Sequence, residues 1–299
     1  MKKVVIVMAL ISATAIFAGC KLMEVASSVG VAAGVISPQQ AQSINKSADA
    51  VGKTFESITP EQEYYIGRAV AATVLKTYKP YDNSKANNYL NVLGQTLATA
   101  SDKPETFGGY HFLIMDTDEI NAFATPGGLI FVSRGLIKLC DSEDAVAAVL
   151  AHEIGHVQLQ HGLQAIKKSR LTSALTILAT ESAKNLGGQN LANLTTAFEG
   201  SINDITSTMV NSGYARKYET AADNAAVTIL KRVSYNPNGL KNMLEQMDTR
   251  MDHNGAGFAK THPDPKSRIK DIEPLTQNFG PISAPAERQN RFKEALAGI

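Results

Sequence analysis

The sequence has no tryptophan, only two cysteines and few aromatic residues, which make up 6% of its 299 positions. Its charges are balanced, with 29 basic and 28 acidic residues and a net charge of +1. No basic block or stripe stands out, and the shortage of aromatic rings leaves little material for stacking on bases. We therefore expect no nucleic-acid partner. A chain of this length can form one large domain or two small ones.

Long apolar runs are also missing, except at the N-terminus. Two lysines precede the apolar segment 4–17, a pattern typical of an export signal and too short to predict a membrane-spanning helix. The segment leads into Ala-Gly-Cys at Cys20, which resembles the bacterial lipobox, although Phe17 stands where leucine is usual. We expect cleavage before Cys20 and lipidation of its thiol. A plain secretory signal with a free Cys20 is the alternative.

The two cysteines have different predicted roles. With Cys20 linked to lipid, no disulfide can form within one chain. Cys140 ends an apolar segment, and we interpret it as a buried structural thiol rather than a zinc ligand. Lys21 follows Cys20, and by analogy with bacterial lipoprotein sorting it favours the outer membrane over the inner one.

Hydrophobic periodicity and turn residues predict mostly helices with a short stretch of strands between them. A threonine cap followed by proline predicts a helix start near residue 59. The expected helices cover about 59–78, 84–100, 141–162, 164–212 (two helices), 214–235 and 236–251, and the expected strands cover 110–115, 122–125 and 129–132.

One motif carries most of the chemical information. His152-Glu153-Ile154-Gly155-His156 is an H-E-x-x-H sequence within an alanine-rich segment predicted to be helical. Histidines four positions apart on a helix project from the same face, so both imidazoles can bind one Zn²⁺. Glu153 then lies where it can take a proton from a zinc-bound water. The apolar stripe of this helix predicts packing on one side and an open cleft on the other.

A catalytic zinc usually has three protein ligands and a water, so a third ligand is needed. His161 does not complete the metzincin pattern, because the required glycine and histidine are absent at 159 and 162. We expect His161 to face solvent at the helix end, where its charge suits the C-terminal dipole. Glu219 is the better candidate. It shares a helical face with Asp223, which can accept the second ring N–H of a liganding histidine.

Two further features border the predicted site. His262 lies in a proline-rich loop near Arg268, and both could supply donors to a developing oxyanion, although a simple surface turn is an equal alternative. The strand 129–132 is expected to offer an edge to which an extended substrate adds as another strand. We expect the segment from Asn121 to Gly127 and Gly128 to border that groove.

Five motifs occur along the chain in a fixed order. They are Glu63-x-x-x-Gly67, Asn121-Ala122-Phe123-Ala124-x-Pro126-Gly127-Gly128, His152-Glu153-x-x-His156, Glu219-x-x-x-Asp223 and Thr261-His262-Pro263-x-x-x-x-Arg268-Ile269. Together they resemble the M48 family of zinc metallopeptidases, and within it the bacterial periplasmic or outer-membrane lipoprotein members. The resemblance covers about residues 58–275.

The resemblance implies an α+β fold class, a helix-rich zincin of the gluzincin type with a short mixed β-sheet beside the H-E-x-x-H helix. This domain would span 58–275, after a signal peptide at 1–19 and a tether with a weak helix at 20–57, and before a C-terminal tail at 276–299. One Zn²⁺ per chain is expected. The resemblance also implies that His262 and Arg268 join Glu153 in the active site.

The function predicted from these features is zinc-dependent endopeptidase activity in the bacterial cell envelope. The substrates would be polypeptides, above all misfolded envelope proteins, and a lipid anchor would hold the enzyme at the periplasmic face of the outer membrane. An alternative is an assembly or chaperone-like factor that binds unfolded outer-membrane proteins, with cleavage secondary or self-inhibited by residues 164–212. A structural zinc site is weaker, because the pattern offers three ligands and a base rather than four ligands.

Overall fold

A computed structural model describes residues 58–165, 199–250, 262 and 264–299. The chain divides into two units, residues 1–59 and residues 60–299, and every element below belongs to the second. The predicted signal segment, Cys20, the tether and most of the helices expected at 164–212 lie outside the described residues. Within the described ranges, no helix combines the length and apolar character that crossing a membrane requires.

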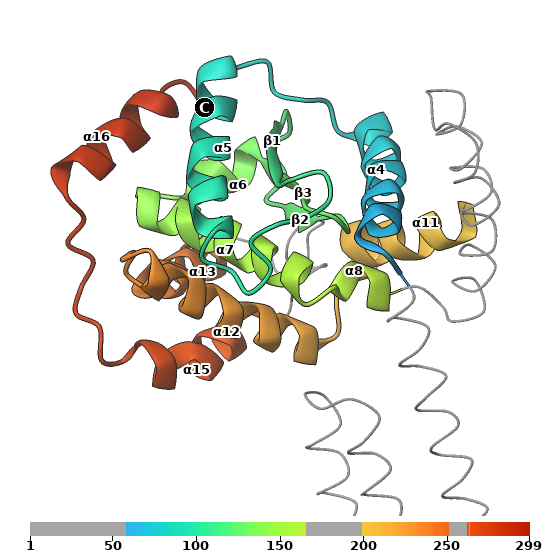
Figure 1. The fold of residues 1–299 in the computed structure, drawn as a ribbon. Coiled ribbons are helices and arrows are strands. Elements are labelled where there is room, and N and C mark those ends of the chain that lie inside the picture. Colours follow the sequence, from blue (N-terminus) through green and yellow to red (C-terminus); the bar gives the residue numbers. More distant parts are fainter. Residues whose placement is uncertain (1–57, 166–198, 251–261, 263) are drawn as a thin grey trace, which may run out of the picture. The chain divides into compact units, whose positions relative to one another are not determined.

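The described part of the chain is built mainly of helices around a small sheet (Figure 1). This confirms the predicted α+β class. In chain order the elements are α4 (Pro60–Thr77), α5 (Ser84–Ala98), β1 (His111–Met115), β2 (Ala122–Ala124), β3 (Leu129–Ser133), α6 (Arg134–Leu139), α7 (Glu143–Gln158), α8 (His161–Gln164), α11 (Glu199–Ser207), the π-helix η1 (Thr208–Ser212), α12 (Arg216–Arg232), α13 (Asn238–Arg250), α15 (Pro265–Thr276) and α16 (Ala286–Ala295).

The three strands found in the described residues form a mixed sheet in the order β1-β3-β2. β3 pairs with β1 in parallel and with β2 in antiparallel fashion. The expectation that the strand 129–132 forms a free edge is therefore wrong, because β3 has a partner on each side. The outer strand is β2. Asn121 and Thr125 hydrogen-bond to β3, so by alternation the backbone groups of Ala122 and Ala124 point away from it.

The other outer strand, β1, is covered by side chains of α5. The backbone N–H of Phe112 donates to Asn91 Oδ1 at 2.9 Å, and that of Ile114 donates to Asn87 Oδ1 at 2.9 Å. Asn91 Nδ2 in turn donates to the carbonyl of Phe112 at 2.6 Å. Two asparagines one helical turn apart thus satisfy the edge of β1 as a neighbouring strand would.

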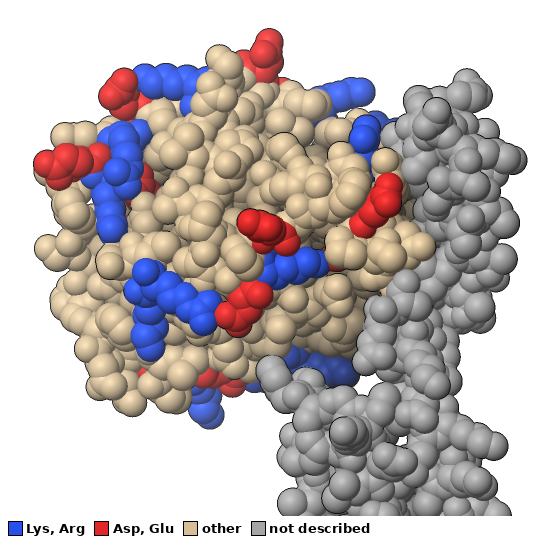
Figure 2. All heavy atoms as spheres, viewed as in Figure 1, with Lys and Arg blue, Asp and Glu red and all other residues tan. Residues whose placement is uncertain are grey.

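α7 is the central element, with α5, α12, α13 and the sheet packed around it (Figure 1). Ser142 caps its start, accepting a hydrogen bond from the backbone N–H of Ala145. Every residue from Glu143 to Val157 is buried, so the expected half-open helix is instead enclosed along its length. On the face drawn in Figure 2, acidic and basic side chains are interspersed among uncharged ones.

The predicted C-terminal tail contains α16, which packs on α5 and α7. Its Arg291 guanidinium pairs with the buried carboxylate of Glu143 in the first turn of α7. The hydroxyls of Tyr89 and Tyr235 also donate to Glu143, at 3.1 and 2.6 Å. A buried carboxylate needs such partners because desolvation penalises its charge. The C-terminal helix therefore helps to hold the start of the central helix.

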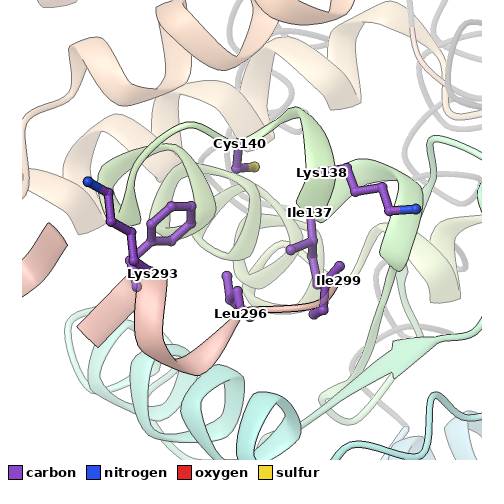
Figure 3. Close-up of a pocket in the computed structure, with 7 residues that line it drawn as sticks. Ile137, Lys138, Cys140, Lys293, Leu296 and Ile299 are labelled. Atoms are coloured by element: carbon purple, nitrogen blue, oxygen red, sulfur yellow. The ribbon is translucent and has the colours of Figure 1, made fainter. Parts of the chain in front are cut away.

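A small pocket of about 170 Å³ opens between α6 and α16 (Figure 3). Cys140 lies in its wall as a buried free thiol, which confirms the predicted burial. Burial raises the pKa of this thiol to about 12, so it stays protonated at neutral pH. The lining residues are Ile137, Lys138, Cys140, Phe292, Lys293, Leu296 and Ile299.

Arg291→Met is expected to lower the free energy of unfolding by roughly 1–3 kcal/mol, because Glu143 loses its cation while keeping two hydroxyl donors. Urea unfolding followed by circular dichroism measures the change. The double variant Arg291→Met/Glu143→Gln should recover part of the loss. Lys85→Met is the control. It removes an exposed ion pair between Lys85 of α5 and Glu294 of α16, the helix that also carries Arg291, and should change the stability little. Equal losses in Arg291→Met and Lys85→Met would contradict the anchoring role of Glu143.

Candidate metal centre and active site

Two helices bring the three predicted metal ligands together. His152 and His156 lie one turn apart on α7, and Glu219 lies in the first turn of α12, all three buried. The Nε2 atom of His152 is 3.5 Å from Glu219 Oε2, and that of His156 is 3.4 Å from Oε1. The two Nε2 atoms are 3.1 Å apart. One nitrogen from each ring therefore faces the same carboxylate.

The close crossing of α7 and α12 makes this convergence possible. A Cβ atom on Gly155, the fourth residue of the motif, would lie 2.9 Å from the carbonyl oxygen of Ala222 and 3.2 Å from the Cβ of Ala225. Glycine and alanine at the crossing thus let the backbones approach. Because Glu219 precedes Ala222 by one helical turn, it projects beside the histidines.

His262 joins the same group. Its Nδ1 atom lies 2.6 Å from Glu219 Oε2, and it is buried. His152, His156, Glu219 and His262 each offer a ligand atom, and these atoms lie within 4.8 Å of one another. From the sequence we interpreted His262 as an oxyanion donor and did not consider it as a ligand. His262 lies 43 positions after Glu219, too far along the chain for helix spacing to predict that the two are in contact.

The donor set fits a zinc ion. Imidazole nitrogens and a carboxylate oxygen are the usual zinc ligands of catalytic sites. Glu219 Oε1 is buried and has no hydrogen-bond partner among the described residues, as expected for an oxygen reserved for a cation. Burial raises the pKa of Glu219, but the surrounding imidazoles outweigh it and hold the pKa well below its usual value. The carboxylate is therefore ionised and ready to bind a metal.

Asp223 and Arg268 lie directly behind His152. Asp223 Oδ1 is 2.8 Å from His152 Nδ1, which is the arrangement that the sequence predicts. Arg268 binds Asp223 through two nitrogens, Nε at 2.9 Å and Nη2 at 2.6 Å. Burial raises the pKa of Asp223, but Arg268 and His152 outweigh it and lower the pKa to about 2. Arg268 therefore fixes the position of the Asp223 carboxylate. Its predicted role as a donor to an oxyanion stays a prediction.

Glu153 has the environment of a general base. Its side chain is buried, and within the described ranges its Oε1 atom has no hydrogen-bond partner. Burial raises the pKa of Glu153 to about 7, with the charge of Glu219 adding to the rise and His152 opposing it. A carboxyl group that titrates near neutrality can both accept and return a proton.

His161 does not face solvent, and that expectation is wrong. It is 3% exposed, and its Nδ1 atom lies 2.8 Å from His156 Nδ1. The sequence predicts that the motif helix continues to Gly162. α7 instead ends at Gln158, and the left-handed conformation of Gln160 separates it from α8, which begins at His161. Burial lowers the pKa of His161 to about 4, so the ring is neutral at neutral pH.

The loop between β2 and β3 is held by α4, which explains the motif Glu63-x-x-x-Gly67. Glu63 Oε1 accepts a hydrogen bond from the backbone N–H of Gly127 at 3.3 Å, while Lys103 pairs with Oε2 at 2.6 Å. Gly67 lies directly against the carbonyl of Pro126. Gly127 and Gly128 have φ angles of +77° and +98°, which favour glycine.

That three residues of the β2–β3 segment border a substrate groove stays a prediction. Asn121, Gly127 and Gly128 belong to this segment of the sheet, yet all three are buried. Gly127 is also occupied by its hydrogen bond to Glu63. What the structure shows of this segment is that its backbone packs against α4.

Residues 84–276 match the profile of peptidase family M48. The chain belongs to this family. The match contains both histidines of the motif, Glu153, Glu219, Asp223, His262 and Arg268, so the metal centre described above is the centre of an M48 domain.

Known M48 proteins match the chain over different lengths. The mitochondrial metalloendopeptidase OMA1 of Schizosaccharomyces pombe is 35% identical over 159 residues, 51% of this chain and 42% of that protein. The β-barrel assembly-enhancing protease of Escherichia coli K12 is 24% identical over 251 residues, 83% of this chain and 51% of that protein. The metalloprotease LoiP of the same strain is 25% identical over 154 residues, 52% of this chain and 58% of that protein. The chain thus spans about half the length of the curated relatives it matches.

Gly67→Ala is expected to destabilise the protein by roughly 1–3 kcal/mol, although alanine is the better helix former. A Cβ at this position would lie 1.7 Å from the carbonyl oxygen of Pro126, so α4 and the loop must separate. Urea unfolding measures the loss. Gly280→Ala is the control, because a Cβ there meets nothing within 4 Å. A Gly67→Ala variant as stable as the control would show that the loop does not depend on this approach.

Proposed function

We propose that this protein is a zinc-dependent endopeptidase of the bacterial cell envelope. The observation that carries the proposal is the convergence of His152 Nε2, His156 Nε2 and Glu219 beside a buried carboxylate, Glu153, whose pKa is about 7. A purely structural metal site has no need of an ionisable group with an unpartnered oxygen at its side. The combination favours hydrolysis over structural binding.

The residues of the site divide the work of peptide hydrolysis. His152, His156 and Glu219 would hold the zinc ion, which supplies the Lewis acidity that lowers the pKa of water and polarises a carbonyl. Glu153 accepts a proton from the attacking water at Oε1 and then donates it to the leaving amine. Asp223, itself held by Arg268, keeps the Nε2 atom of His152 directed at the metal.

An extended substrate would bind along β2 rather than β3. The backbone groups of Ala122 and Ala124 point away from β3, but both residues are buried, so another strand could pair with them only after their cover moves. β2 packs against α7, so a peptide on its outer side would pass close to the motif helix. η1 lies near β2 and would have to give room to that peptide.

The proposed location and substrates rest on the N-terminal sequence and on the relatives. The export signal and Cys20 favour a lipid anchor at the periplasmic face of the outer membrane, with Lys21 as the sorting residue. The name of one relative states that it enhances β-barrel assembly. We extend that to this chain as a role in quality control of envelope or outer-membrane proteins, with misfolded polypeptides as substrates.

A second candidate function is an assembly factor that binds unfolded outer-membrane proteins and cleaves them rarely. The observation in its favour is His262, whose Nδ1 lies 2.6 Å from Glu219 and which makes a fourth donor. Four protein donors leave less room for water than three. Casein digestion with and without a zinc chelator separates the two candidates. Chelator-insensitive suppression of aggregation without cleavage would favour the assembly factor.

Glu153→Gln tests the peptidase. The amide cannot accept a proton from water, so casein cleavage should fall by about 10²–10⁴-fold while zinc content stays at one ion per chain. Cleavage is followed by released fluorescent peptide, and zinc by elemental analysis of the same sample.

Glu105→Gln is the matched control, because it makes the same chemical change on an exposed residue. It should cleave casein at the wild-type rate. Full activity in Glu153→Gln would remove Glu153 from the mechanism, and zinc loss in that variant would mean that it acts on binding instead.

Cys20→Ser tests the lipid anchor. Serine cannot form the thioether, so the protein should move from the membrane fraction to the soluble periplasmic fraction of a Gram-negative host. Mass spectrometry of the wild-type N-terminus should show the acyl mass on Cys20. An unmodified Cys20 in the membrane fraction would contradict lipidation.

A further inference from the structure

His156 has a second contact of its own, behind the metal centre. Its Nε2 atom faces Glu219 and His152, while its Nδ1 atom lies 2.8 Å from the Nδ1 atom of His161. His161 is buried, and its ring meets that of His156 edge to face at a centroid distance of 4.9 Å. The contact therefore joins two imidazoles through nitrogens that point away from the metal.

The backbone is shaped to make this contact. In an unbroken helix, the residue five positions after His156 lies about 140° around the axis, on a different face. Here α7 ends at Gln158, Leu159 has φ −89° and ψ 1°, and Gln160 has φ 54° and ψ 33°. This left-handed residue, which is not glycine, breaks the helix before His161, so the His161 ring lies against His156 instead of on the face that an unbroken helix would give it.

One aromatic ring just before α12 and one in its first turn pack against the pair. Tyr214 stacks on His156 at 4.5 Å between centroids, and Tyr218 lies 4.7 Å from His161. Tyr218 directly precedes Glu219, so the segment that supplies the carboxylate ligand also holds the two imidazoles. Each imidazole of the pair is thus in contact with a tyrosine ring.

In the hydrogen bond between His156 and His161, only one placement of the proton is compatible with a metal ion at His156 Nε2. If His156 carried its proton on Nε2, that hydrogen would lie between the ligand nitrogens, where the ion has to bind. A metal-binding His156 must therefore be protonated on Nδ1, and the atom facing it, His161 Nδ1, must accept. His161 then carries its own proton on Nε2.

We propose that His161 is a positioning residue of the metal centre, whose Nδ1 accepts the Nδ1–H of His156 and fixes the tautomer and orientation of that ligand. This rests on the zinc site of the proposed function. The two histidine ligands are thus supported differently: His152 by the carboxylate of Asp223, and His156 by the imidazole of His161.

Zinc affinity tests the proposal without substrate. His161→Leu keeps a side chain of similar size but removes the hydrogen-bond acceptor, so it should weaken zinc binding by about 10–100-fold. Affinity is measured by competition with a chromophoric chelator on the purified full chain. Wild-type affinity in His161→Leu would overturn the proposal.

Rescue separates hydrogen bonding from packing. The Oδ1 atom of asparagine can occupy the position of His161 Nδ1, so His161→Asn should keep most of the zinc affinity that His161→Leu loses. His111→Leu, at an exposed histidine of β1, should leave the affinity unchanged. A loss in His161→Asn as large as that in His161→Leu, or the same loss in His111→Leu, would overturn the proposal.

The wild-type protein offers a test that does not depend on the folding of a variant. In the zinc-loaded protein, ¹⁵N NMR of the imidazoles should show a proton on His156 Nδ1, none on His161 Nδ1, and scalar coupling between the two nitrogens. A proton on His161 Nδ1 would overturn the proposal. If the wild-type protein binds zinc but cleaves no casein, the peptidase proposal fails while the zinc and NMR measurements still decide the role of His161.

Discussion

The distance between α7 and α12 sets the geometry of the site. A side chain larger than hydrogen at position 155 would push against the Ala222 carbonyl, and any separation of the helices moves Glu219 away from His152 and His156. The ligand set is therefore a consequence of helix packing between small residues. Because α7 is buried on all sides, the packing of α5, α13 and the sheet also bears on the same distance.

Charge balance adds a second constraint. Glu153, Glu219 and Asp223 bring three carboxyl groups into a buried region, where Arg268 pairs with Asp223 and Glu219. Buried charges are costly unless they are paired. The fold meets this cost in part through Arg268 and the imidazoles, and in part because burial raises the pKa of Glu153 and so disfavours its charge. A divalent cation would complete the balance.

Local spacing made part of the site predictable from the sequence. The pairs His152/His156 and Glu219/Asp223 each lie one helical turn apart, and a helix fixes their relative direction wherever it packs. The helix-rich class followed from the same periodicity and from the family motifs. The family resemblance implies that His262 and Arg268 belong to the site, but the contact of Arg268 with Asp223 depends on how α15 packs, and that of His262 with Glu219 on the segment before α15, which no spacing reveals.

The failures have equally local causes. His161 was misplaced because nothing in Leu159-Gln160 signals a left-handed residue, for which glycine or asparagine would be the usual sign. The position of β3 was misjudged because all three strands are short and largely buried, so their sequences carry no alternation that could rank them within a sheet.

The asparagines that cover β1 make the two edges of the sheet different. With Asn87 and Asn91 bonded to one outer strand, a further strand can join only at β2. Two copies of this protein therefore cannot extend one another's sheets in an open series, since each would need a receptive edge on both sides. Covering one edge of the sheet with side chains therefore prevents this sheet from polymerising.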